Sequence, residues 1–261
     1  MTALVVENLS LSVPSRQILR DVSLRVQVGE VVGVVGESGS GKSTTARAVL
    51  GLQPDDATVS GEISVCGHDV VHACPAVLQE VRARQAAMIF QEPRRVLNPV
   101  RRIGDSACER LVRVHGASKS AATAEVSALL AEVGLSDQVL RRYPHELSGG
   151  MLQRVVIAAA LSTGPRLLLA DEATSALDVT TQAEVLAVLR GLQREREMSV
   201  LFITHDLHLA GAYCDRVYVM KDGAVVDHQE ASTIFVNPDN PYTRQLAEAV
   251  PQLPTREVRH A

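Results

Sequence analysis

Four short apolar runs are the clearest pattern along the chain, and each predicts a β-strand that is buried on both faces. They occupy residues 31–35, 86–90, 167–172 and 199–204. Segments with hydrophobic residues at helical spacing lie between them. Because apolar strands alternate with helices, the sequence predicts a mostly parallel α/β sheet.

The remaining segments predict a second kind of sheet and several helices. Residues 3–28 alternate apolar and polar positions, which predicts antiparallel strands with one face in water. Residues 59–70 return to short strands, and residues 217–226 predict a hairpin that turns at Asp222-Gly223. The pattern predicts helices close to residues 42–50, 77–84, 123–133, 150–162 and 180–196, and one or two amphipathic turns after Pro238.

Composition changes after residue 92, where Arg and Pro become frequent and clear strands are missing. We interpret residues 93–150 as a helical insertion. The predicted organisation is a single domain, in which residues 1–92 and 151–230 form a core with an antiparallel β subdomain. Residues 231–261 form a C-terminal tail.

Length and charge limit the possible functions. The 261 residues are 46% hydrophobic, which is enough for a sizeable core. The net charge of −4 argues against a nucleic-acid partner, since such proteins normally carry a basic surface. We expect no signal peptide and no membrane-spanning segment, because no run of about 18 apolar residues occurs.

The first chemical motif follows the apolar run 31–35. Its sequence, GESGSGKST, fits the phosphate-binding loop G-x-x-x-x-G-K-[ST]. Glycines let backbone N–H groups turn toward phosphate oxygens, Lys42 brings a positive charge to the outer phosphates, and the Ser43 hydroxyl can bind Mg²⁺. The candidate nucleotide-binding residues here are Gly36, Glu37, Ser38, Gly39, Ser40, Gly41, Lys42, Ser43 and Thr44.

Polar side chains at the ends of two other buried runs extend this chemistry. Asp171 and Glu172 end the run LLLADE, at the strand edge where ligands bind in parallel sheets. Asp171 can complete the Mg²⁺ shell, and Glu172 can polarise the attacking water. Gln91 follows the run 86–90 and can reach both metal and water. Solvated acids and an ordinary loop glutamine are the alternatives.

Three more positions are candidates. Ser148, Gly149 and Gly150 precede a predicted helix and offer a hydroxyl, free amides and a positive helix end to an anion, although a plain helix cap is the alternative. A second anion cradle in one chain suggests a phosphate shared between two subunits. Asp178 can bind nucleotide or cap the next helix. His205 directly follows a buried strand and can contact the terminal phosphate.

In their order, these motifs resemble the ATP-binding subunits of ABC transporters, over nearly the whole chain. The resemblance implies a P-loop NTPase (RecA-like) core with an antiparallel β subdomain and a helical subdomain. It implies ATP and Mg²⁺ as cofactors and two subunits enclosing two ATP molecules. It also implies Glu172 as general base, His205 as a switch at the γ-phosphate, and integral-membrane permease partners that dock near Gln91.

Smaller features are similar to the peptide/nickel importer branch of this family, above all the tail NPDNPYTRQLAEAVP at 237–251. That branch implies a bacterial protein at the cytoplasmic face of the membrane. It implies import of peptides, nickel or metal–chelator complexes, with an extracytoplasmic binding protein as an indirect partner. Val13-Pro14 replaces the aromatic that stacks on adenine in many relatives, and Ala173 replaces a proline. We expect no iron–sulfur cluster, because the cysteine-rich extension of several relatives does not follow.

Two other classes compete with the importer. A soluble ABC-type ATPase acting on ribosomes or DNA normally has two cassettes or a long coiled-coil insertion, and neither is present. A small-molecule kinase would use the phosphate loop but leaves Ser148–Gly150 unexplained. The sequence leaves open whether the second ATP-binding subunit is another copy of this chain or a different protein.

Overall fold

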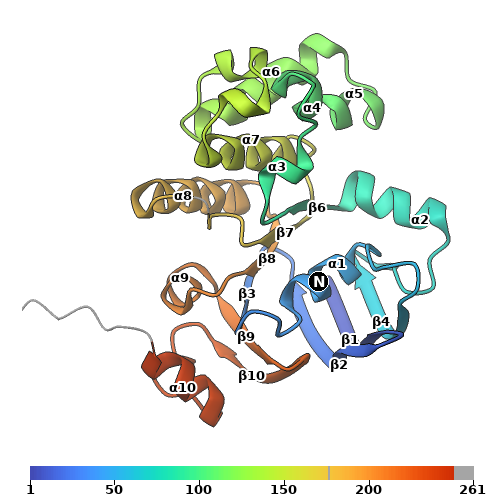
Figure 1. The fold of residues 1–261 in the computed structure, drawn as a ribbon, viewed down its shortest axis with the longest axis vertical. Helices are drawn as coiled ribbons and strands as arrows, with labels where there is room; N and C mark the ends of the chain where they lie inside the picture. Colours follow the sequence, from blue (N-terminus) through green and yellow to red (C-terminus); the bar gives the residue numbers. More distant parts are fainter. Residues whose placement is uncertain (176, 250–261) are drawn as a thin grey trace, which may run out of the picture.

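The computed structural model describes residues 1–175 and 177–249. Ala176, within the Ser-Ala-Leu-Asp segment, and the final two positions of the 237–251 tail lie outside the described residues. Two sheets and a group of helices make up the described part. The helices within residues 93–161 lie at one end of the long axis, and the sheet formed by the N-terminal strands lies toward the other end (Figure 1).

The larger sheet has six strands in the order β10-β9-β3-β8-β7-β6. Five are parallel, and β10 pairs with β9 in the antiparallel direction. The prediction of a mostly parallel α/β sheet is therefore confirmed. The strands are β3 (Val31–Val35), β6 (Ala86–Ile89), β7 (Leu167–Asp171), β8 (Ser199–Ile203), β9 (Arg216–Lys221) and β10 (Ala224–Glu230).

The smaller sheet is antiparallel, in the order β2-β1-β4-β5. Its inward side chains, such as Leu4 and Leu24, share one hydrophobic cluster with Val32 and Val34 of β3. The alternation of apolar and polar positions therefore identified this sheet correctly. The strands are β1 (Thr2–Val13), β2 (Arg16–Gln27), β4 (Thr58–Val65) and β5 (His68–Asp69), and helix α1 (Lys42–Val49) contacts both sheets.

Residues 93–146 form several short helices and one longer one, which pack against α7 (Gly149–Leu161). The longer helix is α6 (Lys119–Glu132), which begins four residues before the predicted 123 because the Ser118 hydroxyl accepts a hydrogen bond from the Ala121 amide. The shorter helices are α3 (Pro93–Val96), α4 (Ile103–Ala107) and α5 (Glu109–Arg113), with 3₁₀ turns at Asp137–Arg141 and Pro144–Glu146.

The other helices surround the large sheet. Helix α2 (Pro75–Glu80) precedes β6 in the chain and continues as a π-helical turn at Val81–Gln85. Helix α8 (Val179–Glu195) matches the helix predicted close to residues 180–196. Helix α9 (Leu207–Tyr213) was not predicted, because it has only seven residues and contains Gly211. Helix α10 (Pro241–Ala249) exceeds the two predicted turns, since nine residues span about 2.5 turns. No helix in the described part of the chain is both long enough and apolar enough to cross a bilayer.

Candidate functional site

The phosphate loop joins β3 to α1 at the carboxyl edge of the large sheet. Gly36 has φ +148°, and a Cβ there would lie 2.2 Å from the Met220 carbonyl oxygen, so only glycine fits. Gly39 and Gly41 also have positive φ, at +83° and +103°. These conformations turn the backbone of the loop, as the sequence motif predicts. Ser40 is buried, whereas Glu37 and Ser38 are exposed.

Lys42 lies inside this loop with only 6% of its surface exposed. Its ammonium donates hydrogen bonds of 2.8 Å to the carbonyl oxygens of Gly36 and Glu37. Burial lowers the pKa of Lys42, while the nearby carboxylates of Glu172 and Asp171 oppose that shift. The charge therefore points into the loop, within reach of an anion that the backbone amides would hold.

Ser43 and Asp171 come together although 128 positions separate them. The Ser43 hydroxyl donates a 2.8 Å hydrogen bond to Oδ1 of Asp171, which is 1% exposed at the end of β7. Burial raises the pKa of Asp171, and the bond from Ser43 opposes that shift. A hydroxyl and a carboxylate are hard oxygen donors of the kind that Mg²⁺ prefers, so this pair fits the predicted metal site.

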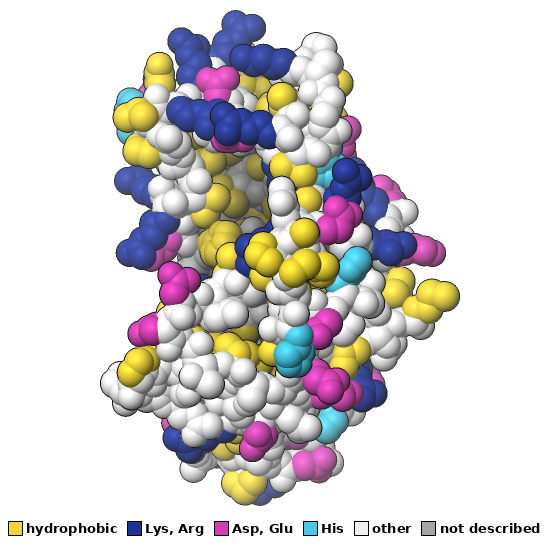
Figure 2. All heavy atoms as spheres, turned by 90° about the vertical axis from the view of Figure 1, so that its right-hand side faces the viewer, with side chains coloured by type: hydrophobic (Ala, Val, Ile, Leu, Met, Phe, Trp, Pro, Cys, Tyr) yellow, Lys and Arg dark blue, Asp and Glu magenta, His cyan; other side chains and the backbone are white. Residues whose placement is uncertain are grey.

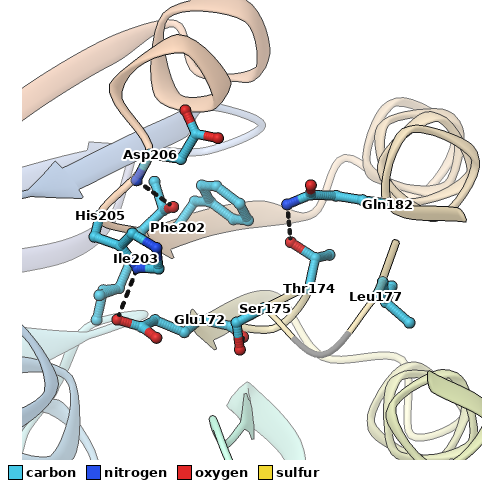
Figure 3. A pocket seen from close by; sticks show the side chains of 10 residues that line it. Glu172, Thr174, Ser175, Leu177, Gln182, Phe202, Ile203, His205 and Asp206 are labelled. Carbon is cyan, nitrogen blue, oxygen red and sulfur yellow. Dashed lines mark hydrogen bonds and ion pairs between the residues drawn. The ribbon is translucent and has the colours of Figure 1, made fainter. Parts of the chain in front are cut away.

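Glu172 is the centre of a hydrogen-bonded group of three side chains. Gln91 Nε2 donates to Glu172 Oε2 over 2.6 Å, and His205 Nδ1 lies 3.3 Å from Glu172 Oε1. Figure 3 shows Glu172 and His205 pointing toward each other across the pocket. Because β6, β7 and β8 are parallel neighbours, their carboxyl ends deliver these three residues to one place.

The backbone of Glu172 is also unusual. Its φ is +48°, a left-handed conformation that costs a non-glycine residue about 1 kcal/mol or more. The Glu172 amide donates to the Ile203 carbonyl oxygen at 3.0 Å, which holds this conformation against β8. The strained position aims the carboxylate at Gln91 and His205 instead of letting it follow the strand.

Sequence reasoning missed two glutamines that hold the residues just after Glu172. Gln153 of α7 is fully buried and donates a 2.6 Å hydrogen bond to the Ala173 carbonyl oxygen. Gln182 of α8 donates to Thr174 Oγ1 at 2.9 Å, and Figure 3 shows this contact across the pocket. The signal for Gln153 was a polar residue within the apolar helix pattern that follows Ser148.

Two predicted nucleotide contacts act as helix caps in this chain. The Ser148 hydroxyl accepts a hydrogen bond from the Met151 amide at the start of α7, and the Asp178 carboxylate accepts one from Thr181 at the start of α8. Within the described part of the chain, no hydrogen bond joins Ser148–Gly150 to the phosphate loop. A cap leaves the neighbouring amides free for an anion, so both roles are compatible.

Comparisons with known proteins agree with this geometry. The family model described as ABC transporter matches residues 19–175. The chain is 44% identical to YejF, an uncharacterised ABC transporter ATP-binding protein of Escherichia coli, over 96% of this chain but only 49% of YejF. It is 41% identical to the oligopeptide transport ATP-binding protein OppD of Salmonella typhimurium, over 90% of this chain and 71% of OppD. The chain thus spans about half the length of YejF and about seven-tenths of the length of OppD.

Solved structures match the fold as well. A dimeric ATP-binding cassette, MJ0796, bound to ADP and Pi in a post-hydrolysis state, superposes with a TM-score of 0.79 at 28% identity, covering 87% of this chain and 98% of that one. The fold is therefore that of a P-loop NTPase. The chain belongs to the ABC transporter ATP-binding family, which confirms the resemblance drawn from its motifs.

Proposed function

We propose that this chain is the ATP-hydrolysing subunit of a bacterial importer, working at the cytoplasmic face of the membrane. The observation that carries this proposal is the position of Glu172. It lies between Gln91 and His205 at the sheet edge that also holds the phosphate loop. A carboxylate held in this way is suited to activate a water molecule beside a bound triphosphate.

The chain's own residues suggest how hydrolysis proceeds. Lys42 exchanges the carbonyl oxygens of Gly36 and Glu37 for phosphate oxygens when ATP enters. Ser43, Asp171 and the side-chain carbonyl oxygen of Gln91 would hold Mg²⁺, which would supply charge neutralisation at the phosphates. Glu172 takes a proton from water while the water oxygen bonds to the γ-phosphorus. The bond between the γ-phosphorus and the β,γ-bridging oxygen breaks, which leaves ADP and phosphate. His205 contacts the γ-phosphate.

A second subunit completes the site in this proposal. Ser148 caps the N-terminus of α7, and Gly149 and Gly150 are its first two residues, so this segment offers the positive end of a helix to an anion. We assign it to the ATP held by a partner subunit, as the resemblance of the motifs implies. In this proposal Asp178, which caps α8, also contributes to the interface.

The permease would dock beside Gln91. A surface hollow there is lined by Phe90, Gln91, Val96 and charged neighbours, and Val96 and Val100 are 45% and 81% exposed. Figure 2 shows Lys and Arg side chains gathered over the helical end above a hollow that hydrophobic side chains partly line. An apolar hollow with a charged rim is suited to a helix from a membrane partner. In this proposal, residues 93–150 carry the docking subdomain.

Peptides are the substrate class we favour. The relatives include OppD and a probable D,D-dipeptide transport ATP-binding protein, DdpD of Escherichia coli, which is 44% identical over 90% of this chain. Nickel and metal–chelator complexes, which the branch also implies, have no support among these names. Selection of the peptide would lie with the permeases and an extracytoplasmic binding protein.

The experiment is a pull-down of the tagged chain from membranes of its own source, with identification of the proteins that copurify. We expect two multi-span permeases, with or without a second ATP-binding subunit. Val96→Asp should lose the permeases, while Val28→Asp, at a similarly exposed site (50%), should keep them. Recovery of ribosomal or DNA-repair proteins without a permease would favour the soluble class of ABC-type ATPase instead.

A further inference from the structure

The Asn-Pro-Tyr-Thr motif at the start of α10 has no role in the ATPase mechanism proposed above, but it attaches α10 to the large sheet. Asn240 Nδ2 donates to the Val226 carbonyl oxygen at 2.9 Å, and Asn240 Oδ1 accepts from the Tyr242 amide at 2.8 Å. The Thr243 hydroxyl, which is fully buried, donates to Asp227 Oδ2 at 2.7 Å. The motif therefore fixes α10 to strand β10, and α10 lies beside β10 in Figure 1.

The same hairpin lies against the phosphate loop. The amide of Gly223, in the β9–β10 turn, donates to the Ser40 carbonyl oxygen at 3.1 Å. The Met220 carbonyl of β9 lies so close to Gly36 that no side chain fits there. Any movement of the hairpin would consequently reach the backbone that cradles phosphate.

Tyr242 of α10 lies near the phosphate loop. Its ring is only 8% exposed and lies under the Lys221 ammonium, which is 4.4 Å from the ring centroid. Its hydroxyl lies near Glu37, yet it forms no hydrogen bond with any residue in the described part of the chain. A buried hydroxyl without a partner is costly, so a small shift of the loop that completed this bond would be favoured.

Glu37 connects Tyr242 to the nucleotide site. The carbonyl oxygen of Glu37 is one of the two that hold Lys42 at 2.8 Å, and Lys42 must leave it to reach a phosphate. Burial raises the pKa of the Tyr242 phenol, so this side chain keeps its proton at neutral pH and can donate it to the Glu37 carboxylate.

We propose that Tyr242 is a positioning residue for the phosphate loop, acting on Lys42 through Glu37, and that docking of α10 is coupled to nucleotide binding. The coupling is reciprocal: ATP tightens the docking of α10, and a docked α10 favours ATP. The proposal uses ATP binding alone, so it stands or falls independently of the import function.

The test compares Tyr242→Phe, which keeps the ring over Lys221 and removes the hydroxyl, with Gln245→Ala at an exposed position of the same helix. We expect Tyr242→Phe to raise the ATP dissociation constant by about 3- to 10-fold, the effect of one hydrogen bond, with little change in the thermal midpoint. Gln245→Ala should leave affinity unchanged. Equal affinity of Tyr242→Phe and the unmodified chain would overturn the proposal.

Hydrogen exchange on the unmodified protein gives a second readout that needs no variant. MgATP should slow exchange of the amides in 241–249, and this protection should be smaller in Tyr242→Phe. Exchange in α10 that is the same with and without MgATP would also overturn the coupling, because a helix with a purely structural role would not respond to nucleotide.

Discussion

Gln91 and Glu172 end neighbouring parallel strands, and the Gln91 side-chain amide donates a 2.6 Å hydrogen bond to the Glu172 carboxylate. Each residue lies just beyond its strand, β6 or β7, so the register of the sheet places the two together. The contact orients Glu172 and links it to the segment beside the proposed permease site. A change at the proposed permease surface would therefore reach Glu172, the group that we propose activates water.

Gln91→Ala should lower kcat while ATP still binds. The lost bond is to a charged group and contributes roughly 1.5–3 kcal/mol, so we expect a fall of at least about 10-fold if the orientation matters mainly in the transition state. Steady-state ATPase assays measure this, with Gln79→Ala on the surface of α2 as control. An unchanged kcat would mean that Gln91 does not orient Glu172 during the reaction.

Lys42→Ala should lose affinity for ATP. A charged hydrogen bond to phosphate contributes roughly 1.5–3 kcal/mol, or about 10- to 150-fold in the dissociation constant. Binding of a fluorescent ATP analogue measures the change, and Lys119→Ala, an exposed lysine on α6, should bind normally. Tight binding by Lys42→Ala would show that the backbone of the loop suffices and that the buried ammonium contributes little.

Ser148→Arg should block ATP turnover without weakening ATP binding to the separate subunit. The larger, charged side chain should fill the anion cradle that we assign to the partner's nucleotide. No hydrogen bond joins Ser148 to its own phosphate loop in the described part of the chain. ATP hydrolysis by the complex purified from membranes measures turnover, with Ser120→Arg on α6 as control. If Ser148→Arg weakened binding to the isolated chain, the cradle would belong to the same subunit.

Asp215→Asn should lower the free energy of unfolding by about 1–2 kcal/mol. Asp215 joins two elements: Oδ1 lies 2.6 Å from Arg190 Nη2 of α8, and Oδ2 accepts from the Val31 amide of β3 at 2.8 Å. Partial burial raises the pKa of Asp215, but the bonds from Arg190 and Val31 outweigh it, and the net pKa is below the ordinary value.

The lowered pKa sets the pH dependence of this effect. The contribution of Asp215 is complete above the ordinary aspartate pKa and is lost as pH falls through the lowered value. Urea unfolding of the native chain and Asp215→Asn should thus differ most near neutral pH and converge in acid. A difference that grew on acidification would contradict a lowered pKa of Asp215 in the folded chain.

The parallel sheet and the phosphate loop were predictable because each rests on local pattern. Val31–Val35 is apolar throughout, and GESGSGKS has the glycines that its positive-φ positions require. The approach of Asp171, Glu172, Gln91 and His205 was also predictable, since parallel strands end at one edge. Their individual roles remain predictions.

The rest depends on tertiary contacts that the sequence does not encode locally. Gln153 donates to the Ala173 carbonyl oxygen across 20 positions, and Tyr242 lies near Glu37 although 205 positions separate them. Helix α9 has too few residues for a clear periodic pattern, and its start depends on the Asp206 cap. The tail motif was recognisable by resemblance, but its attachment to β10 became visible only in the structure.

The most direct test of the catalytic assignment is single-turnover ATP hydrolysis by Glu172→Gln, measured beside equilibrium ATP binding. Glutamine keeps the size of the side chain and removes the base. We expect the rate to fall by about 10²- to 10⁴-fold while ATP binding persists and the closed pair of subunits accumulates with MgATP. Hydrolysis at nearly the native rate would contradict Glu172 as the group that activates water.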